Sequence, residues 1–483
     1  MTLRTRRVLF YSLLLLFIVF GAGAVFYSRG WRINTDNCEI KSLQGCKIKL
    51  QKTGAIFIAT KPQGVTIKID GKSFKDKSGL VQSGTLIGNL LPHSYRIFVS
   101  KDGYEPWEKD FQVLPEFVAE ARKIILVPKE ITREQIAIKR FRGDHLLDFS
   151  SDGNKLITED TIRKIYYLYD LNNLDSVFNI NVNFQNLKTP TPSGVGVPTA
   201  SVGKDGLIKK IVFHPFDPDK LIIETNSGLY ILDVARIQLE NLSLTHSIDS
   251  GLILSKVEGL KRPLIWATRS PNIYYIEASK NPTHTLTSFN LVVKAKTATY
   301  DLTVNPDAQI SALSLSISQN KIAYLTSLND LYVLDIRDGS LKKIAHNAGL
   351  FAFSPDSKKI AFLDNNCDTK AIGEPCFSGP INIYFIESGD GNLRERTGET
   401  ITLYPKGVVS IRNIAWYRDS AHFLVQYFGE DKKQRIDFVE IDDRSPLNQE
   451  KLIGDVSSFY YDHRLNPVYY LLENGLYFFE IEK

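Results

Sequence analysis

A short pattern that recurs along the C-terminal part of the chain constrains the fold more than any other feature. Its clearest copy, FSPDSKKIAF at residues 353–362, has apolar residues on both sides of a Ser-Pro-Asp sequence. Proline presets the backbone φ angle, and Ser and Asp side chains bond to nearby backbone groups, so this sequence favours a turn between two strands. Further copies, from close to weak, lie at residues 149–157, 212–223, 264–276, 315–324, 416–425 and 459–470.

Each copy is followed by an apolar strand that ends in an acidic residue or Asn, as in LYVLDI at residues 331–336. The residues at this position are Asp170, Asp233, Asn290, Asp335, Glu387, Glu440 and Glu480. They are 40 to 63 residues apart, which is the spacing of propeller blades. Strands that are apolar on both sides fit sheets covered by neighbours on both faces. The sequence therefore predicts a β-propeller over residues 129–483, with seven blades favoured and six or eight left open.

Two segments refine this prediction. The last unit has no residues left for an outer strand, and the alternating segment EQIAIKRF at residues 134–141 is expected to complete it and close the ring. Residues 187–207, rich in Pro, Thr, Ser and Gly, are expected to form a flexible insertion between the first two blades. The turn motifs, Ser354-Pro355-Asp356 above all, resemble the repeats of TolB and WD-type propellers.

An uncharged apolar run of 21 residues, 8–28, follows the sequence MTLRTRR at the N-terminus. A helix rises about 1.5 Å per residue, so a run of this length predicts a transmembrane helix. The preceding arginines favour a cytoplasmic tail at residues 1–7, a single-pass topology in the cytoplasmic membrane, and extracytoplasmic C-terminal domains. Ala22-Gly23-Ala24 leaves a cleaved signal peptide as the alternative, but the apolar run continues to Tyr27, which favours a retained helix.

The four cysteines fall into two close pairs. Cys38 and Cys46 lie in the juxtamembrane segment, residues 29–52, and Cys367 and Cys376 lie in a loop-like stretch further on. An even number of cysteines in close pairs on an exported chain predicts two local disulfides. The spacing is too wide for a common zinc motif and lacks His partners, and free thiols are the other alternative.

Residues 53–128 show a different, alternating pattern. Val65, Ile67 and Ile69 lie on one face of a predicted strand, and Tyr95, Ile97 and Val99 lie on one face of another. Asp70-Gly71 and Asp102-Gly103 are each predicted to form a hairpin turn. This pattern predicts a small β-sandwich.

The same region contains Pro62-Gln63-Gly64-Val65, then Leu91-Pro92-His93-Ser94-Tyr95, then Gly103-Tyr104. In order and spacing these resemble the Pro-Glu-Gly-Ala, Leu-Pro-Gly-x-Tyr and Gly-Tyr elements of the PEGA domain, with two of the four signature positions changed and without the usual glycine after Pro92. The resemblance implies a β module of a microbial envelope protein, without catalytic residues. Tyr104 and Trp107 would then pack the sandwich or, less favoured, stack on a sugar.

A search for catalytic and binding motifs is negative. The chain lacks a Gly-x-Ser-x-Gly elbow, a phosphate-binding glycine loop and a paired-His metal motif, so neither catalytic residues, nor a metal, nor a cofactor are predicted. The net charge of +5 is spread over interspersed Lys, Asp and Glu, which argues against nucleic-acid binding. The repeated acids occupy one equivalent position in every unit, as structural repeats do.

Two function classes remain. The favoured one is a membrane-anchored binding or scaffold protein of the cell envelope, not an enzyme, whose propeller binds an envelope protein or a cell-surface glycan. The alternative is an envelope hydrolase, glycosidase or peptidase-like, with carboxylates on propeller loops.

Overall fold

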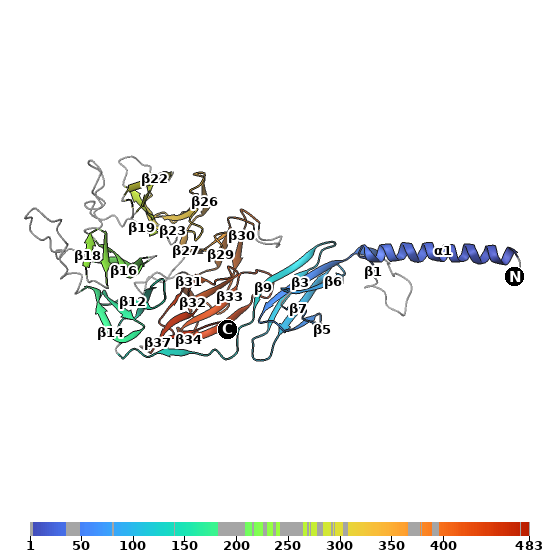
Figure 1. Ribbon diagram of the computed structural model, residues 1–483, viewed down its shortest axis with the longest axis horizontal. Coiled ribbons are helices and arrows are strands. Elements are labelled where there is room, and N and C mark those ends of the chain that lie inside the picture. Colours follow the sequence, from blue (N-terminus) through green and yellow to red (C-terminus); the bar gives the residue numbers. More distant parts are fainter. Residues whose placement is uncertain are drawn as a thin grey trace, which may run out of the picture.

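The computed structural model describes residues 3–34, 49–79, 82–139, 141–181, 208–214, 217–225, 229–234, 238–241, 264–267, 270, 272–277, 284–290, 293, 295–302, 308–365, 377, 379–388, 396–473 and 475–482. Apart from one N-terminal helix, its long elements are strands, as the sequence predicts. The helix projects from one end of the molecule, a small β domain follows it, and a larger group of sheets lies beyond (Figure 1). The predicted insertion at residues 187–207 lies outside the described residues.

Helix α1 (Leu3–Ser28) contains the whole apolar run and is exposed along its length. Within the described residues it is the helix that is long and apolar enough to cross a membrane, with a mean hydropathy of 2.5. A secretory signal sequence has the same features, so the helix itself is confirmed and its retention in a membrane stays a prediction.

A two-stranded hairpin that the sequence did not suggest follows the helix. Strand β1 (Trp31–Asn34) pairs antiparallel with β2 (Lys49–Lys52), and Trp31 lies opposite Lys52. The Trp31 ring also meets the Phe26 ring of α1 edge to face at 6.4 Å. The first part of the chain after the helix is therefore held against the last turn of α1.

The predicted disulfide residues Cys38, Cys46, Cys367 and Cys376 all lie outside the described residues. The strands that flank them are described. The first pair lies between β1 and β2, and the second pair lies between β28 (Lys359–Asp364) and β29 (Ile381–Phe385), which also pair antiparallel. Each cysteine pair is thus located in a connection whose ends are held together, and the two disulfides stay a prediction.

The small β domain (residues 53–128) consists of two sheets. Their strands are β3 (Gly54–Lys61), β4 (Thr66–Ile69), β5 (Lys72–Lys75), β6 (Thr85–Leu90), β7 (Ser94–Ser100), β8 (Trp107–Gln112) and β9 (Val118–Ile125). One sheet has the order β6-β3-β9 and the other β5-β4-β7-β8. A single hydrophobic core lies between them and contains both predicted inward faces, which confirms the sandwich.

The two predicted turns of this domain differ. Asp70 and Gly71 both have positive φ, 47° and 79°, and join β4 to β5 directly, as a two-residue hairpin turn requires. Asp102-Gly103 also forms a turn, closed by a bond from the Tyr104 N–H to the Lys101 carbonyl at 3.1 Å, but this turn lies inside a longer hairpin connection between the antiparallel strands β7 and β8. Trp107 is only 3% exposed, which supports the packing role over a sugar-stacking one.

The remaining residues, 134–482, form the repeat region, in which the described strands make seven four-stranded antiparallel sheets. The strands are β10 (Glu134–Ile136), β11 (His145–Phe149), β12 (Lys155–Asp160), β13 (Ile165–Asp170), β14 (Asn173–Asn179), β15 (Ile208–His214), β16 (Asp217–Thr225), β17 (Leu229–Asp233), β18 (Gln238–Asn241), β19 (Leu264–Trp266), β20 (Asn272–Glu277), β21 (His284–Asn290), β22 (Ala295–Leu302), β23 (Ile310–Leu315), β24 (Lys321–Thr326), β25 (Leu331–Asp335), β26 (Leu341–Ala345), β27 (Ala348–Phe353), β28, β29, β30 (Thr400–Leu403), β31 (Ser410–Trp416), β32 (His422–Phe428), β33 (Gln434–Glu440), β34 (Gln449–Gly454), β35 (Ser458–Tyr461), β36 (Val468–Leu472) and β37 (Gly475–Phe479).

Six of these sheets use four consecutive strands, and the seventh combines the two ends of the region. In that sheet β10 pairs antiparallel with β37, with Glu134 opposite Phe478 and Ile136 opposite Leu476. The predicted pairing of the 134–141 segment with the last unit is therefore confirmed, over a shorter strand than expected.

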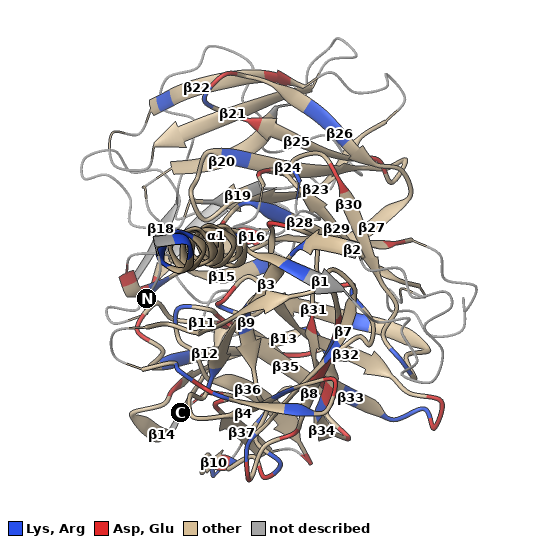
Figure 2. Ribbon diagram, turned by 90° about the vertical axis from the view of Figure 1, so that its right-hand side faces the viewer, with Lys and Arg blue, Asp and Glu red and all other residues tan. Residues whose placement is uncertain are grey.

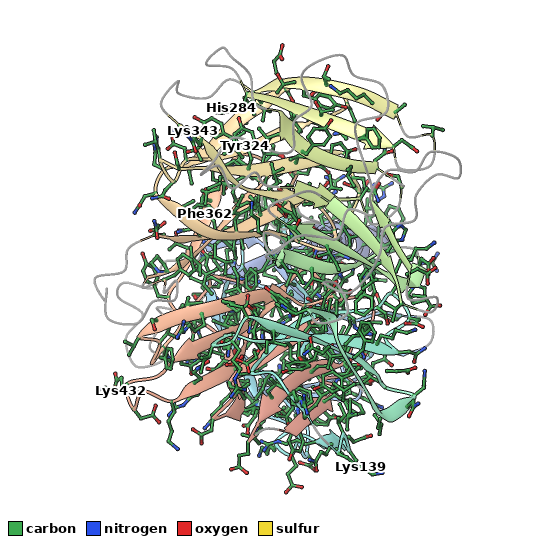
Figure 3. All side chains as sticks on the ribbon, turned by 90° about the vertical axis from the view of Figure 1, so that its left-hand side faces the viewer. Lys139, His284, Tyr324, Lys343, Phe362 and Lys432 are labelled. Carbon is green, nitrogen blue, oxygen red and sulfur yellow. The ribbon has the colours of Figure 1, made fainter. Side chains whose placement is uncertain are left out.

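Neighbouring sheets pack face to face. The first strands of adjacent sheets contact one another: β11 meets β35 and β15, and β23 and β27 form a row with β19 and β31. Hydrophobic clusters fill the space between the sheets, and all six residues of β24 are buried, because both of its faces are covered. In Figure 3 the buried Tyr324 and Phe362 lie among the strands, whereas Lys432 and Lys139 lie at the outer edge.

Each sheet of the repeat region has two distinct ends. At the end that we call proximal, the first strand turns into the second and the third into the fourth. At the distal end the second strand turns into the third, and the fourth leads to the next sheet. The three longest connections, residues 180–207, 242–263 and 365–380, all join strand ends on the distal side.

Candidate functional site

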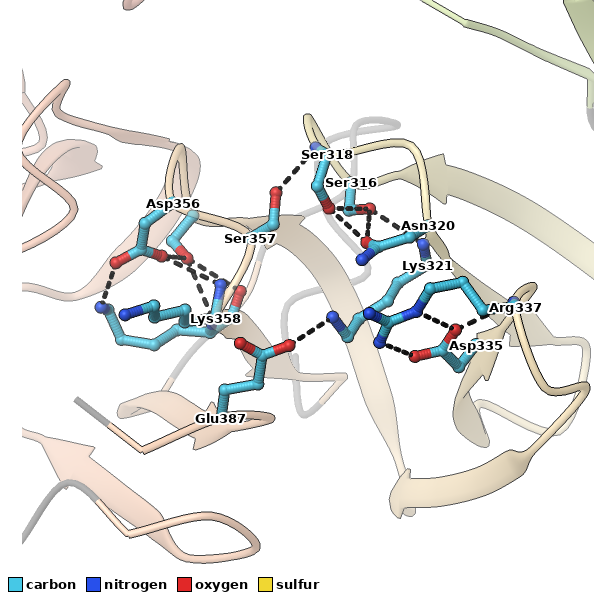
Figure 4. Close-up of polar contacts among 12 residues, drawn as sticks. Ser316, Ser318, Asn320, Lys321, Asp335, Arg337, Asp356, Ser357, Lys358 and Glu387 are labelled. Atoms are coloured by element: carbon cyan, nitrogen blue, oxygen red, sulfur yellow. Dashed lines mark hydrogen bonds and ion pairs between the residues drawn. The ribbon is translucent and has the colours of Figure 1, made fainter.

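The recurring turn of the sequence lies at the proximal end and has the same hydrogen bonds in several sheets (Figure 4). The side-chain oxygen of Ser354 accepts a bond from the Lys359 backbone N–H at 3.0 Å and donates one to Asp356 at 2.5 Å. Ser316 accepts the equivalent bond from Lys321 at 3.0 Å. The Ser-x-Asp pattern is therefore explained by the closure of a five-residue turn between two strands.

These turns also bond to one another across neighbouring sheets. The Ser318 N–H donates to the Ser357 hydroxyl at 3.0 Å, and the Asp356 N–H donates to the Ser420 hydroxyl at 3.0 Å. One sheet further on, the Arg418 N–H donates to the Tyr461 hydroxyl at 3.1 Å. The proximal ends of consecutive sheets thus lie side by side on one face of the repeat region.

In two of these sheets the lysine that follows the turn forms an ion pair. The Lys321 side chain is 4% exposed, and its Nζ lies 2.7 Å from Glu387 of the next sheet. Lys359 is equally buried and lies 2.8 Å from Asp356. Although burial opposes ionisation of the Asp356 carboxyl, the charge of Lys359 keeps its pKa below the usual value.

The repeated acids of the sequence take matching places in this arrangement. Asp335 lies opposite Lys321 in the strand ladder, and Asp170 lies opposite Lys155. Hydrogen bonds from Arg337 lower the pKa of Asp335, so this carboxylate is already neutralised by its neighbours. Asp335 and Asp170 therefore lie at the proximal ends of the third strands of their sheets, in agreement with the structural role that their equivalent positions suggest.

A groove of about 280 Å³ lies at the proximal face between the β23–β26 and β27–β30 sheets. Its described cations are all engaged: Lys321 with Glu387, Arg337 with Asp335, and Lys342 with the Tyr384 ring at 5.2 Å. Each of these cations therefore already has a partner within the groove.

A densely connected polar cluster lies where the small β domain meets the sheet β31–β34. We call this contact region the junction. Lys109 of β8 is fully buried, and its Nζ lies 2.9 Å from Glu440 Oε2 at the end of β33. The same ammonium donates to the backbone carbonyls of Asp442, at 2.8 Å, and Pro446, at 3.3 Å. All three donors of this buried charge are thus satisfied.

The Glu440 carboxylate accepts two further hydrogen bonds. Trp107 Nε1 donates to Glu440 Oε2 at 3.1 Å, and Asn448 Nδ2 donates to the same oxygen at 2.8 Å. Beside it, His422 is buried and stacks on Phe438, with its Nδ1 2.6 Å from Asp419. Burial opposes a charge on this imidazole, but the Asp419 carboxylate outweighs it and raises the pKa of His422.

Contacts at the rim extend this junction. Arg444 donates to the Glu120 carbonyl at 2.9 Å, Lys123 donates to the Asp419 carbonyl at 2.7 Å, and Lys61 pairs with Glu482 at 2.9 Å. A polar cleft of about 110 Å³ remains between β9 and the turns of two sheets. The small β domain is therefore fixed on the proximal face by buried polar bonds as well as by apolar packing.

The junction also contains an acid held close to other acids. Burial, with the nearby Glu105 and Asp437 carboxylates, raises the pKa of Glu450 to about 7. Between about pH 4.5 and 7 the folded state holds a proton that the unfolded chain has lost, so the contribution of Glu450 to stability is largest below about pH 4.5 and falls as pH rises to about 7.

We expect Glu450→Gln to remove this dependence. The variant should melt at the same temperature as the natural protein below about pH 4.5 and at a higher temperature above about pH 7, because only the natural protein must ionise the group there. Thermal melts over this pH range measure the difference. A difference that does not change with pH would contradict the assignment.

Sequence reasoning predicted neither catalytic nor metal-binding residues. Among the described residues no group of three or more His, Cys, Asp or Glu side chains is placed to hold a metal ion. The buried Lys109 was missed, although a signal exists: Trp107, Lys109 and Phe111 alternate on one face, which places a lysine on the apolar side of a strand. His422 is buried beside Asp419 and Phe438, which is a structural position.

Comparisons with protein-family models and with the curated proteins give no match for this chain.

Proposed function

We propose that this chain is a membrane-anchored, extracytoplasmic binding or scaffold protein of the cell envelope, which holds a protein or glycan partner without turning it over. In this proposal α1 stays in the cytoplasmic membrane, the PEGA-like small β domain acts as a spacer, and the repeat region is a seven-bladed propeller of the TolB or WD type.

The propeller proposal is supported by the order of the sheets. They follow one another along the chain, the first strands of several neighbouring sheets meet, and the seventh sheet joins β10 to β37. Such an arrangement leaves only short, protected strand edges and gives a rigid scaffold.

The position of the long connections is the observation that carries the binding proposal. The small β domain occupies part of the proximal face, through bonds to Asp419, Asp442 and Pro446 in proximal connections. The longest connections belong to the distal ends instead. Specificity in a rigid scaffold is usually carried by its variable loops, so we assign partner binding to the distal face.

Exposed apolar side chains support the same face. The large apolar residues that are well exposed in the described repeat region are Ile162, Val293, Leu328, Tyr404 and Val409. All of these except Val293 lie in distal connections. Exposed apolar residues are common contact points for macromolecules.

A site-specific photo-crosslinking experiment tests this function. A photoreactive amino acid would replace Ile162 or Leu328, in distal turns, and Asp338, in an exposed proximal turn, in the full-length protein in its native envelope. We expect crosslinks to a defined envelope component from the two distal positions and none from Asp338, because the partner covers only the distal face. All three positions are in short surface turns, so the melting temperature should not change.

Crosslinks from Asp338 alone, or from none of the three positions, would contradict the distal assignment. Hydrolysis of the crosslinked glycan or peptide by the purified protein would contradict the absence of turnover.

A further inference from the structure

The small β domain exposes large apolar side chains at the end from which α1 projects. Together with Leu50 of the adjoining strand β2, we call Leu114, Phe117 and Val118 the basal patch; the exposed fractions of Leu50, Leu114, Phe117 and Val118 are 52%, 40%, 55% and 42%. None of them belongs to the core between the two sheets of the domain. A group of exposed apolar side chains in one place indicates an interaction surface.

A chain of backbone hydrogen bonds ties this patch to the end of the helix. The Thr53 N–H donates to the Gly30 carbonyl at 2.9 Å, two residues beyond α1. The Glu116 N–H donates to the Thr53 carbonyl at 3.0 Å, and the Ala55 N–H donates to the Phe117 carbonyl at 3.0 Å. The loop that contains Leu114 and Phe117 is therefore one strand spacing away from the residues that bond to the helix end.

Glycine permits this close approach. A Cβ atom at Gly54 would overlap the carbonyl oxygen of Leu114 and lie 2.9 Å from that of Phe117. A side chain at this position would push the loop away. The glycine at position 54 therefore allows the loop that contains Leu114 and Phe117 to lie beside the end of the helix.

Side chains of the types that are common at membrane interfaces lie at the end of α1 and on the β1–β2 hairpin. The Arg32 guanidinium lies 3.5 Å from the centre of the Tyr27 ring, and Lys52 Nζ lies 5.5 Å from that of Trp31. Tyr, Trp and long cationic side chains are enriched at the boundary between lipid and water. Figure 1 shows β1 at the end of α1, between the helix and the strands of the small β domain, and Figure 2 views the molecule along α1.

We propose that the basal patch lies on the surface of the membrane that α1 crosses, with Phe117 and Leu50 inserted between the lipid headgroups and the acyl chains. This inference rests on the proposed membrane anchor. The uncharged run ends at Ser28 and is about as long as a bilayer core is thick, so residues bonded to Gly30 lie at the interface. The lipid surface then shields side chains that water would otherwise surround.

Tryptophan fluorescence tests this contact in the full-length protein. Phe117→Trp and, as a matched control, Ile162→Trp would be reconstituted in vesicles of phosphatidylcholine and phosphatidylglycerol, with and without bromine on the acyl chains near the headgroup. Ile162 is 89% exposed and lies in a distal turn of the repeat region. The signal of each added tryptophan is its variant minus the natural protein, and Trp31→Phe isolates the signal of Trp31, which reports on the helix end.

We expect the brominated lipid to quench Trp31 and the added tryptophan at 117, with a blue-shifted emission at 117, and to leave the one at 162 unquenched. If Trp31 is quenched and position 117 is not, the anchor stands and the patch proposal fails. If position 117 instead blue-shifts only as protein density rises, a second copy covers the patch, and the proposal again fails.

Two outcomes separate this proposal from the one on which it rests. If neither Trp31 nor position 117 is quenched, the helix does not hold the protein in the membrane and the anchor itself is wrong. If position 162 is quenched as strongly as position 117, the repeat region also lies on the lipid, and the patch is not the contact surface.

Discussion

Replacing Lys109 by methionine is expected to destabilise the protein by about 3–5 kcal/mol, because it leaves the buried Glu440 carboxylate without its cation. Glu440 is itself largely buried, and the remaining donors to it, Trp107 and Asn448, are neutral. The carbonyls of Asp442 and Pro446 lose their donor in the same substitution. The loss of stability should appear first at the junction and not in the sheets far from the small β domain.

Chemical denaturation and hydrogen exchange measure this effect together. The Asp110 N–H donates to the Ser445 carbonyl at 2.7 Å across the junction, so its exchange rate should rise in the variant. The matched control is Lys109→Met combined with Glu440→Gln, which removes both charges and should recover most of the stability. Equal destabilisation by the single and the double variant would show that packing, and not the unpaired charge, dominates.

Replacing Phe385 by alanine is expected to cost about 3–5 kcal/mol as well, for a different reason: it opens a cavity between two sheets. Phe385 is fully buried in a cluster that also contains Trp416 and Phe423 of the next sheet. Phe385→Leu, which keeps most of the volume, should cost clearly less, and Ile162→Ala on the surface should have almost no effect. Denaturant midpoints of the full-length variants measure the series.

The same series separates stability from function. At a temperature where Phe385→Ala remains folded, its distal crosslinks should match those of the natural protein, because the cavity lies inside the scaffold. Loss of the crosslinks without loss of structure would mean that the space between these sheets takes part in partner binding. A cost below that of Phe385→Leu would contradict the close packing of the two sheets.

The repeat and the small β domain could be predicted because their signals are local. A Ser-x-Asp turn followed by an apolar strand needs only neighbouring residues, and the bond between Ser354 and the Lys359 N–H spans five positions. The inward faces of β4 and β7 follow from alternation alone. Asp102-Gly103 forms the predicted turn, but the two residues do not indicate that the connection around them is longer than that at Asp70-Gly71.

The basal patch and the distal binding face were harder to predict from the sequence. Phe117 reads as an ordinary apolar residue of a β domain, and only the hydrogen bonds through Thr53 place it beside the helix end. The β1–β2 hairpin was missed because each strand has only four residues and shows little alternation. The distal assignment needs the strand order, which no single segment contains.

The sequence by itself determined the apolar helix, the β class of the rest, the repeating unit and the inward faces of the small β domain, because turn chemistry and polarity patterns act over a few residues. Only the tertiary structure decided where the small β domain sits. Its position depends on pairs such as Lys109 with Glu440, which lie in separate parts of the chain. Neither local pattern indicates that this lysine and this glutamate meet; folding removes both from water, and the cost of an unpaired buried charge then makes each depend on the other.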